Sequence, residues 1–230
     1  MTSVDPDVAE IAHSRERLIQ EALERDGDPN ALDQLGSPLI VWASACGSPD
    51  TVRALIDRGA NVNLPGRARD TALMHAVPRD DTAFTAMLVA AGAEINVRDI
   101  FGNTPLMVAV SARNGEAAGA LIAAGAHVNI HSTYGDTALM IAVRWGCLDV
   151  LDLLIREGAD VNATDCRGRS ALLTAVTRTT PSTAVVERLL EAGADPLLRD
   201  SFGRGALDIA LARGYQVIAE TLRDGSVRPR

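Results

Sequence analysis

The tetrapeptide Thr104-Pro105-Leu106-Met107 recurs, slightly altered, along almost the whole chain. Its counterparts are Ser37-Pro38-Leu39-Ile40, Thr71-Ala72-Leu73-Met74, Thr137-Ala138-Leu139-Met140 and Ser170-Ala171-Leu172-Leu173. The first residues of the five copies lie 34, 33, 33 and 33 positions apart. A nearly fixed period of this length indicates one structural unit that is stacked several times. Such a stack presents a long surface rather than one central pocket.

The unit from Asp99 to Ile130 predicts two helices separated by a break. Thr104 is a favourable N-cap, and Pro105 suits the first helical position. Apolar residues then follow at the spacing of one helix face: Leu106, Ala109 and Val110. A second helix is expected from about residue 116 to 124, and Gly125 ends it because glycine readily adopts the left-handed conformation. Each unit is therefore predicted to contain a turn, a short helix, a break, a longer helix and a closing glycine.

A second landmark repeats with nearly the same period. The pentapeptide Gly158-Ala159-Asp160-Val161-Asn162 has variants that begin at Gly59, Gly92, Gly125 and Gly193. Successive copies lie 33, 33, 33 and 35 positions apart. Two independent landmarks with a common period make a chance pattern very improbable and support the repeat.

The sequence resembles the ankyrin repeat family through two motifs. These are Gly-x-Thr-Pro-Leu at residues 102–106 and Gly-Ala-Asp-Val-Asn at residues 158–162. The resemblance covers roughly residues 15–225 and implies an all-α solenoid of stacked helix-turn-helix units with protruding β-turn or hairpin loops. The chain departs from the family at the histidine that often follows Thr-Pro-Leu, where it has Ile40, Met74, Met107, Met140, Leu173 and Asp208. Apolar packing is expected to replace this histidine in all units but the last.

The periods divide residues 1–230 into one predicted ankyrin-repeat domain. An N-terminal capping helix with its closing turn is expected at 8–30, and a C-terminal capping repeat at 199–225 is followed by a tail at 226–230. Five repeats are expected between the caps, at 33–64, 65–97, 98–130, 131–163 and 164–198. The last unit should present a polar outer face, which keeps a stack soluble. That face carries Gln216, Glu220 and Arg223.

Composition argues against several classes of function. The net charge is −8, and the 22 basic residues are all arginine, spread along the chain and outnumbered by 30 acidic residues. Nucleic-acid binding needs a clustered positive face, so no nucleic-acid partner is expected. No phosphate-binding loop, nucleophile elbow, zinc-protease motif or dinucleotide fingerprint occurs. We therefore expect neither enzymatic activity nor a metal or other cofactor.

The cysteines and hydropathy suggest a location. The chain has three cysteines and no CxxC pair, which fits a reducing compartment. Residues 1–6 do not begin a secretory signal peptide, and no uninterrupted apolar run is long enough to span a membrane. A cytoplasmic protein without membrane attachment, and a monomer, is expected.

Two departures from the period have structural or functional interpretations. Trp42 stands where other units have alanine, and it is expected to fill space beside the capping helix. The fifth unit is two residues longer, and its hydroxyl-rich segment 177–183 should project from the surface. That segment could be a tolerated insertion, a partner contact or a site of phosphorylation.

The family resemblance implies a partner surface on the concave side, formed by turn tips and short helices. At the turn tips it nominates Phe101, Asn103, Tyr134, Asp136, Arg167, Arg169, Phe202 and Arg204. On the short helices it nominates Arg79, Ser111, Ala112, Arg144, Trp145, Arg178 and Arg213. Trp145 is singled out because the core does not require a large aromatic residue at the end of a short helix, and Trp, Tyr and Arg predominate at interface hot spots. For the three turn aromatics, packing along the neighbouring turn is the alternative interpretation.

The resemblance therefore favours a non-enzymatic interaction module that binds a protein partner through its concave groove and turn tips. Two alternatives remain open at this stage. One is a secreted effector or toxin-neutralising inhibitor that uses the same surface. The other is an enzyme or ligand-binding protein with its site in the groove.

Overall fold

The computed structural model describes residues 6–24, 26–46, 48–79 and 81–227. Within these residues it contains thirteen α-helices, and isolated β-bridges close three of the loops. The chain forms two compact units, one ending at Ile100 and the other beginning at Phe101. The predicted all-α class is confirmed, as are one N-terminal helix and six helix pairs in the described part of the chain.

Unit 1 contains the N-terminal helix and two helix pairs. Its helices are α1 (Pro6–Leu23), α2 (Leu39–Cys46), α3 (Pro49–Asp57), α4 (Ala72–Ala76) and α5 (Thr82–Ala90). Helix α1 packs on both α2 and α3, and α2 packs on α4. Trp42 of α2 is only partly buried, and the Arg15 guanidinium of α1 lies 5.7 Å from the centre of its ring. The predicted packing of Trp42 beside the capping helix is thus correct, but the residue lies at the edge of the core.

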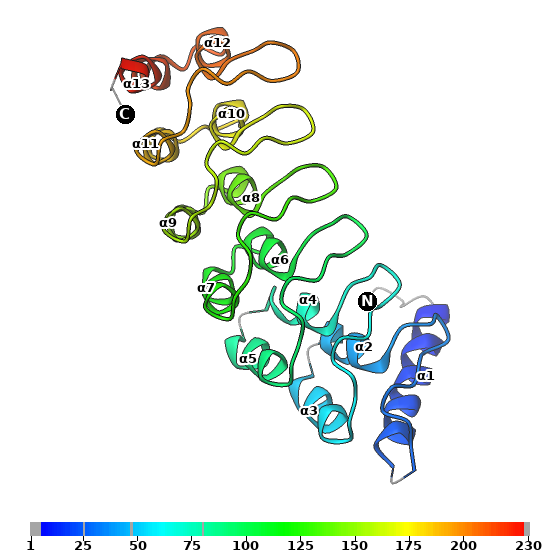
Figure 1. The fold of residues 1–230 in the computed structure, drawn as a ribbon. Helices are drawn as coiled ribbons and strands as arrows, with labels where there is room; N and C mark the ends of the chain where they lie inside the picture. The colour runs from blue at the N-terminus through cyan, green and yellow to red at the C-terminus, as the bar shows by residue number, and fades with distance from the viewer. Residues whose placement is uncertain (1–5, 25, 47, 80, 228–230) are drawn as a thin grey trace. The chain divides into compact units, whose positions relative to one another are not determined.

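The described residues of unit 2 form four helix pairs, which lie in two layers (Figure 1). The short helices are α6 (Pro105–Ser111), α8 (Ala138–Trp145), α10 (Ala171–Thr177) and α12 (Ala206–Ala212). The partner helices are α7 (Gly115–Ala123), α9 (Leu148–Arg156), α11 (Thr183–Glu191) and α13 (Gln216–Val227). Each short helix packs on the next short helix, and the loops extend from the short-helix layer away from the other layer (Figure 1).

The short helices of unit 2 begin where the tetrapeptides predict. The hydroxyls of Thr104, Thr137 and Ser170 each accept a hydrogen bond of 3.3 Å from the backbone N–H three residues on. In the last repeat Gly205 is the N-cap residue, and the Asp208 carboxylate accepts from its backbone N–H at 3.0 Å. Asp208 therefore stabilises the start of α12 from the position where the family often has histidine.

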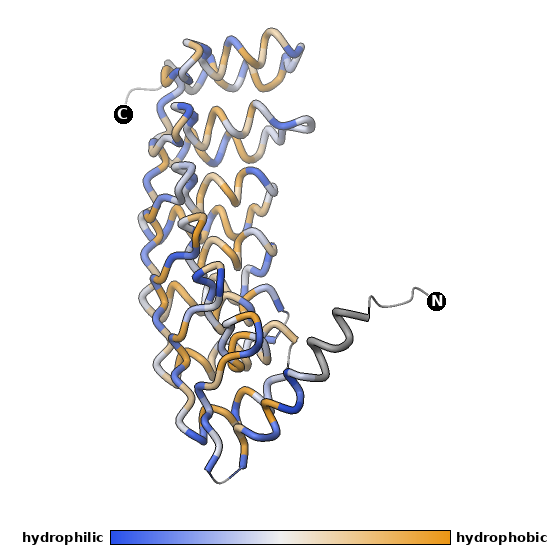
Figure 2. Tube along the Cα trace, turned by 90° about the vertical axis from the view of Figure 1, so that its right-hand side faces the viewer, coloured by the Kyte–Doolittle hydropathy of each residue, from blue (hydrophilic) through white to orange (hydrophobic). Residues whose placement is uncertain are grey.

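Small and apolar residues explain the close packing of the short helices. Ala109, Ala142, Ala175 and Ala210 are each 0% exposed. Met107, Met140 and Leu173 are each 1% exposed, which confirms the apolar replacement of the usual histidine in these units. The short helices α6, α8 and α10 are apolar along almost their whole length and mostly buried, as expected of helices that are covered on several sides. Figure 2 shows hydrophobic stretches prominent along the helices of the tube.

The closing pentapeptide joins successive repeats through its asparagine. The Asn129 side-chain oxygen accepts from the Asp160 N–H at 2.8 Å, and its amide donates to the Gly158 carbonyl at 3.0 Å. Asn162 makes the same two bonds with Asp195 and Gly193. These bonds satisfy loop backbone groups, which is why the asparagine recurs with the period.

The two ends of the described chain are helical. Helix α1 ends at Leu23, and turns cover much of the remainder of the predicted 8–30 segment. Helix α13 continues to Val227, past the predicted end at 225, and residues 228–230 lie outside the described part. Gln216, Glu220 and Arg223 are exposed on α13, so the predicted polar outer face is confirmed. In the part that the structure describes, no helix is both long and apolar enough to span a membrane.

Candidate protein-binding surface

The loops of unit 2 share one pattern of hydrogen bonds. In the fifth repeat, Asp165 Oδ1 accepts from the backbone N–H groups of Arg167 at 2.8 Å and Arg169 at 2.9 Å. Asp200 in the last repeat and Ser132 in the fourth hold their loops in the same way. The side-chain oxygen thus fixes the turn and presents the residue two positions on at its tip.

The tips of unit 2 are joined in a row. Cys166 N–H donates to the Tyr134 carbonyl at 3.0 Å, and Thr133 N–H donates to the Phe101 carbonyl at 2.8 Å. Ser201 N–H makes the equivalent bond to Arg167 at 2.8 Å. We call the four tip residues the tip row: Phe101, Tyr134, Arg167 and Phe202. The three aromatic residues are 49%, 59% and 75% exposed in chain order, so about half or more of each is accessible.

Two arginines of the loops are held by buried aspartates. Arg169 contacts Asp165 Oδ2 through Nε at 2.8 Å and Nη2 at 2.6 Å. Arg204 contacts Asp200 Oδ2 at 2.9 and 2.7 Å, and its guanidinium lies 5.0 Å from the Phe202 ring centre. The aspartate side chains are only 3% and 2% exposed, whereas those of the arginines are 30% and 55% exposed. The arginines are therefore oriented while part of each remains accessible to a partner.

The same contacts keep both aspartates ionised. The side-chain hydrogen bond from Arg204 is the largest influence on Asp200 and lowers its pKa; desolvation opposes this, and backbone N–H groups reinforce it. For Asp165, burial is the largest single influence and raises the pKa, but hydrogen bonds from Arg169 and Arg167 together outweigh it. Both carboxyl groups thus have a pKa below the ordinary value.

These shifts predict an acid-sensitive contribution to stability. The pKa of Asp200 is lower in the folded protein than in the unfolded chain, where an aspartate has a pKa of about 3.9. Ionised Asp200 therefore adds to the free energy of unfolding at pH values above the unfolded-state pKa. This contribution is lost as the pH falls through the folded-state pKa. We expect Asp200→Asn to unfold at lower urea concentration than the wild type at pH 7, and the difference to shrink below about pH 4. Urea titrations followed by circular dichroism at several pH values measure this. Glu220→Gln, on the exposed face of α13, is the control; a constant Asp200→Asn difference between pH 7 and pH 3 would contradict the prediction.

The arginines at the ends of the short helices stabilise the scaffold. Arg178 donates to the Val143 carbonyl at 2.8 Å, at the end of α8. Arg213 donates to the carbonyls of Thr177 at 2.7 Å and Arg178 at 3.1 Å, at the end of α10. A cation is favourable at a helix C-terminus, where carbonyls lack intrahelical partners. Arg79 of unit 1 donates in the same way to Ala45 near the end of α2. Contact of these nominated arginines with a partner stays a prediction.

Trp145 occupies the position in the fourth repeat that corresponds to Arg178 in the fifth, one period earlier. Its side chain is 50% exposed at the end of α8. The neighbouring Arg144 pairs with Asp136 at 2.5 Å. Ala112, the corresponding residue of the third repeat, is small and exposed, as is Ser111. A large aromatic residue thus stands where the next two repeats have an arginine that caps the preceding helix.

Hydrogen bonds from the last repeat hold the N-terminal part of the fifth-repeat insertion, and exposed residues follow. Arg213 and the Tyr215 hydroxyl contact the Arg178 carbonyl, and Tyr215 also donates to Thr179 at 3.3 Å. Thr179 and Thr180 are exposed, as expected of a projecting segment.

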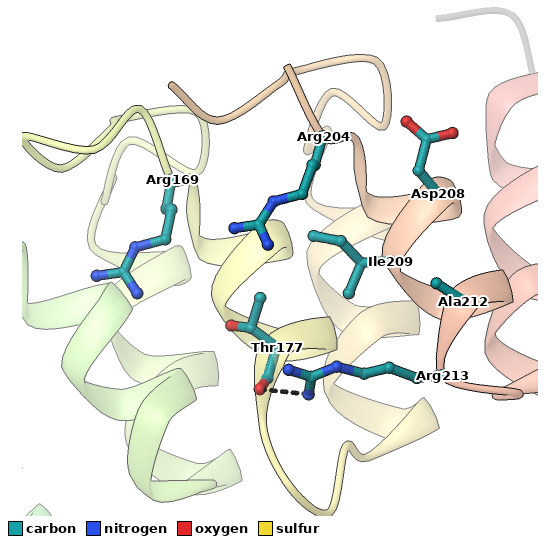
Figure 3. Close-up of a pocket in the computed structure, with 7 residues that line it drawn as sticks. All are labelled: Arg169, Thr177, Arg204, Asp208, Ile209, Ala212 and Arg213. Atoms are coloured by element: carbon teal, nitrogen blue, oxygen red, sulfur yellow. Dashed lines mark hydrogen bonds between the residues drawn. The ribbon is translucent and has the colours of Figure 1, made fainter. Parts of the chain in front are cut away.

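A pocket of 480 Å³ opens in unit 2 between the last two repeats (Figure 3). Its lining brings together three arginines that the sequence nominated: Arg169, Arg204 and Arg213. Asp208, Ile209 and Ala212 also line it and were not nominated. Thr177, a further lining residue, begins the segment 177–183, for which a partner contact was one interpretation. The positions of Ile209, Ala212 and Arg213 along α12 could have indicated a common face, but their proximity to Thr177 needs the packing of α12 on α10.

The remaining nominated residues vary in accessibility. Asn103 is half-buried, and Arg167 is exposed at its tip. Arg79 belongs to unit 1, whereas the other nominated residues lie in unit 2. Among the described residues, no three His, Cys, Asp or Glu side chains gather as candidate metal ligands.

A family model described as ankyrin repeats (3 copies) matches residues 9–99 and 79–165. The chain belongs to the ankyrin repeat family. A search of curated proteins found no match. Ankyrin repeats generally serve as protein–protein interaction modules, and the helix pairs and projecting loops described above have the corresponding arrangement.

Proposed function

We propose that this ankyrin repeat protein is a non-enzymatic module that binds a protein partner across the short helices and tip row of unit 2. The observation that carries the proposal is the half-exposed Trp145, at a position where the following repeats have a helix-capping arginine. An exposed tryptophan offers a large apolar contact area and a polar N–H, which suits a hot spot.

The surroundings of Trp145 support the same surface. Tyr134 of the same repeat and Phe101 of the one before are exposed at the tips. Backbone bonds between adjacent loops hold these tips, so little conformational entropy would be lost when a partner binds. Rigid aromatic residues beside oriented arginines favour recognition of a folded protein surface or an extended segment.

Charge favours a protein partner over nucleic acid. The chain has a net charge of −8, and Arg169 and Arg204 are each paired with a buried aspartate. These pairs reduce the positive field that attraction of phosphates requires. The free thiols of Cys46, Cys147 and Cys166 suit a reducing compartment, so we propose that the protein acts in the cytoplasm. Action as a monomer stays a prediction.

Site-specific photo-cross-linking in the native cell tests the proposal. Tyr134 and Val217 are 59% and 63% exposed, on the tip row and on α13. A benzoylphenylalanine at position 134 is expected to form one predominant adduct with a partner protein, and the same group at 217 to form far less. Equal or stronger adducts of that partner at position 217 would overturn the proposed surface.

A further inference from the structure

Three guanidinium groups share the lining of the pocket between the last two repeats. Arg169 and Arg204 come from successive loops, and Arg213 from the residue after α12. Ile209 lies between Arg204 and Arg213, and the three guanidinium groups extend to the same side of α12 (Figure 3). Ile209 and Ala212 add apolar surface to this pocket of 480 Å³.

The arginines are oriented by the scaffold before any ligand arrives. Asp165 holds Arg169, Asp200 holds Arg204, and the Thr177 carbonyl holds Arg213 at 2.7 Å. A guanidinium has five N–H donors in a fixed plane. Both hydrogen bonds of Arg213 use Nη1, so within the described residues its Nε and Nη2 groups remain available for an acceptor.

The charge around the pocket matches a single negative charge. Asp208 also lines the pocket, but its carboxylate points away from the three guanidinium groups and pairs with Arg199 at 2.8 Å. The charged residues that line the pocket, counted together with their ion-pair partners, are four arginines (169, 199, 204 and 213) and three aspartates (165, 200 and 208). Their sum is one net positive charge. A carboxylate carries one negative charge at neutral pH, whereas a phosphate ester carries about 1.5 to 2. The balance therefore favours a carboxylate.

We infer that this pocket is a carboxylate-recognising subsite, which seats a glutamate or aspartate side chain from an acidic segment of the protein partner. The planar guanidinium groups bind the carboxylate oxygens, and Ile209 and Ala212 contact the aliphatic part of the side chain. The exposed Phe202 ring beside Arg204 extends the contact surface for the residues that flank the acidic side chain. The inference rests on the proposed function and adds the chemistry of the partner.

Nuclear magnetic resonance titration with a defined probe tests the subsite. The probe is the N-acetylated, C-amidated tetrapeptide Gly-Gly-Glu-Gly, which carries one negative charge, and its Gly-Gly-Gln-Gly analogue is the matched control. The Nε–Hε resonances of Arg169, Arg204 and Arg213 are expected to shift and saturate with one dissociation constant at about millimolar probe concentration. The glutamine analogue should shift them little, and added salt should weaken binding of the glutamate probe.

Matched variants separate the pocket from general surface charge. Arg204→Gln and Arg213→Gln are each expected to weaken probe binding about tenfold. Arg156→Gln, on the exposed face of α9, should leave it unchanged. Arg204 also pairs with the buried Asp200, and Arg213 also caps α10. Ala212→Glu therefore provides a second route, because it places a carboxylate in the pocket without removing either contact, and it should abolish probe binding.

The outcomes are distinct from those of the cross-linking experiment. Equal shifts of arginines throughout the chain, or equal weakening by Arg156→Gln, would overturn the subsite. Tighter binding of a phosphoserine peptide than of the glutamate probe would overturn the choice of carboxylate. A partner that cross-links at position 134 but binds Ala212→Glu as well as the wild type would leave the protein-binding function standing and reject the subsite.

Discussion

Gly135→Ala is expected to destabilise unit 2 by about 3 kcal/mol or more. Gly135 has φ of +80°, where a side chain alone costs about 1–2 kcal/mol. A Cβ there would also lie 2.7 Å from the Cys166 nitrogen and 2.8 Å from the Asp165 Cα. Both are backbone atoms, so the methyl group would push apart the loops that the Cys166–Tyr134 hydrogen bond joins.

Gly203→Ala is the matched control. Gly203 occupies the same loop position in the last repeat, with φ of +75°, but nothing lies within 4 Å of the point where its added methyl group would sit. It should lose only the conformational part, about 1–2 kcal/mol. Urea unfolding monitored by circular dichroism gives both free energies. Equal losses in the two variants would show that the close approach of the loops contributes nothing.

The local features of the fold were predictable because they depend on neighbouring residues. Thr104 and Ser170 accept from backbone N–H groups three residues away, so short-range rules suffice to place these helix starts. The recurrence of Asn129 and Asn162 marked the period, but their bonds to the next loop required the spatial stacking of repeats. The period of the sequence thus indicates which residues have a structural role, but not which residues they contact.

The candidate site was less predictable because its contacts join different repeats. Arg178 and Arg213 were nominated as partner contacts, yet their guanidinium groups reach carbonyls of the preceding repeat. Trp42 was expected beside the capping helix, but its partial burial and the Arg15 guanidinium over its ring became visible only in the structure. The exposure of Trp145 followed from its place at a helix end and is confirmed at 50%. Its contact with a partner stays a prediction.

Trp145→Ala is expected to weaken partner binding by about 30-fold or more. Truncating a hot-spot tryptophan costs about 2 kcal/mol or more of binding free energy, which corresponds to that ratio of dissociation constants. The stability of the free protein should fall by less than about 1 kcal/mol, because half of the side chain is already exposed to water.

Trp42→Ala is the opposite control, since Trp42 and Trp145 are the two tryptophans of the chain. Trp42 is partly buried on α2 of unit 1, against Arg15. Its truncation should lower stability by about 2 kcal/mol or more and leave the affinity of the remaining folded protein nearly unchanged. The two variants therefore separate loss of fold from loss of surface.

The decisive measurement is the dissociation constant of the purified complex with the partner cross-linked at position 134. Isothermal titration calorimetry of the wild type and Trp145→Ala, with melting temperatures from the same preparations, provides it. Binding through the short helices and tip row of unit 2 predicts a dissociation constant raised about 30-fold or more at nearly constant melting temperature. An unchanged dissociation constant for Trp145→Ala would contradict it.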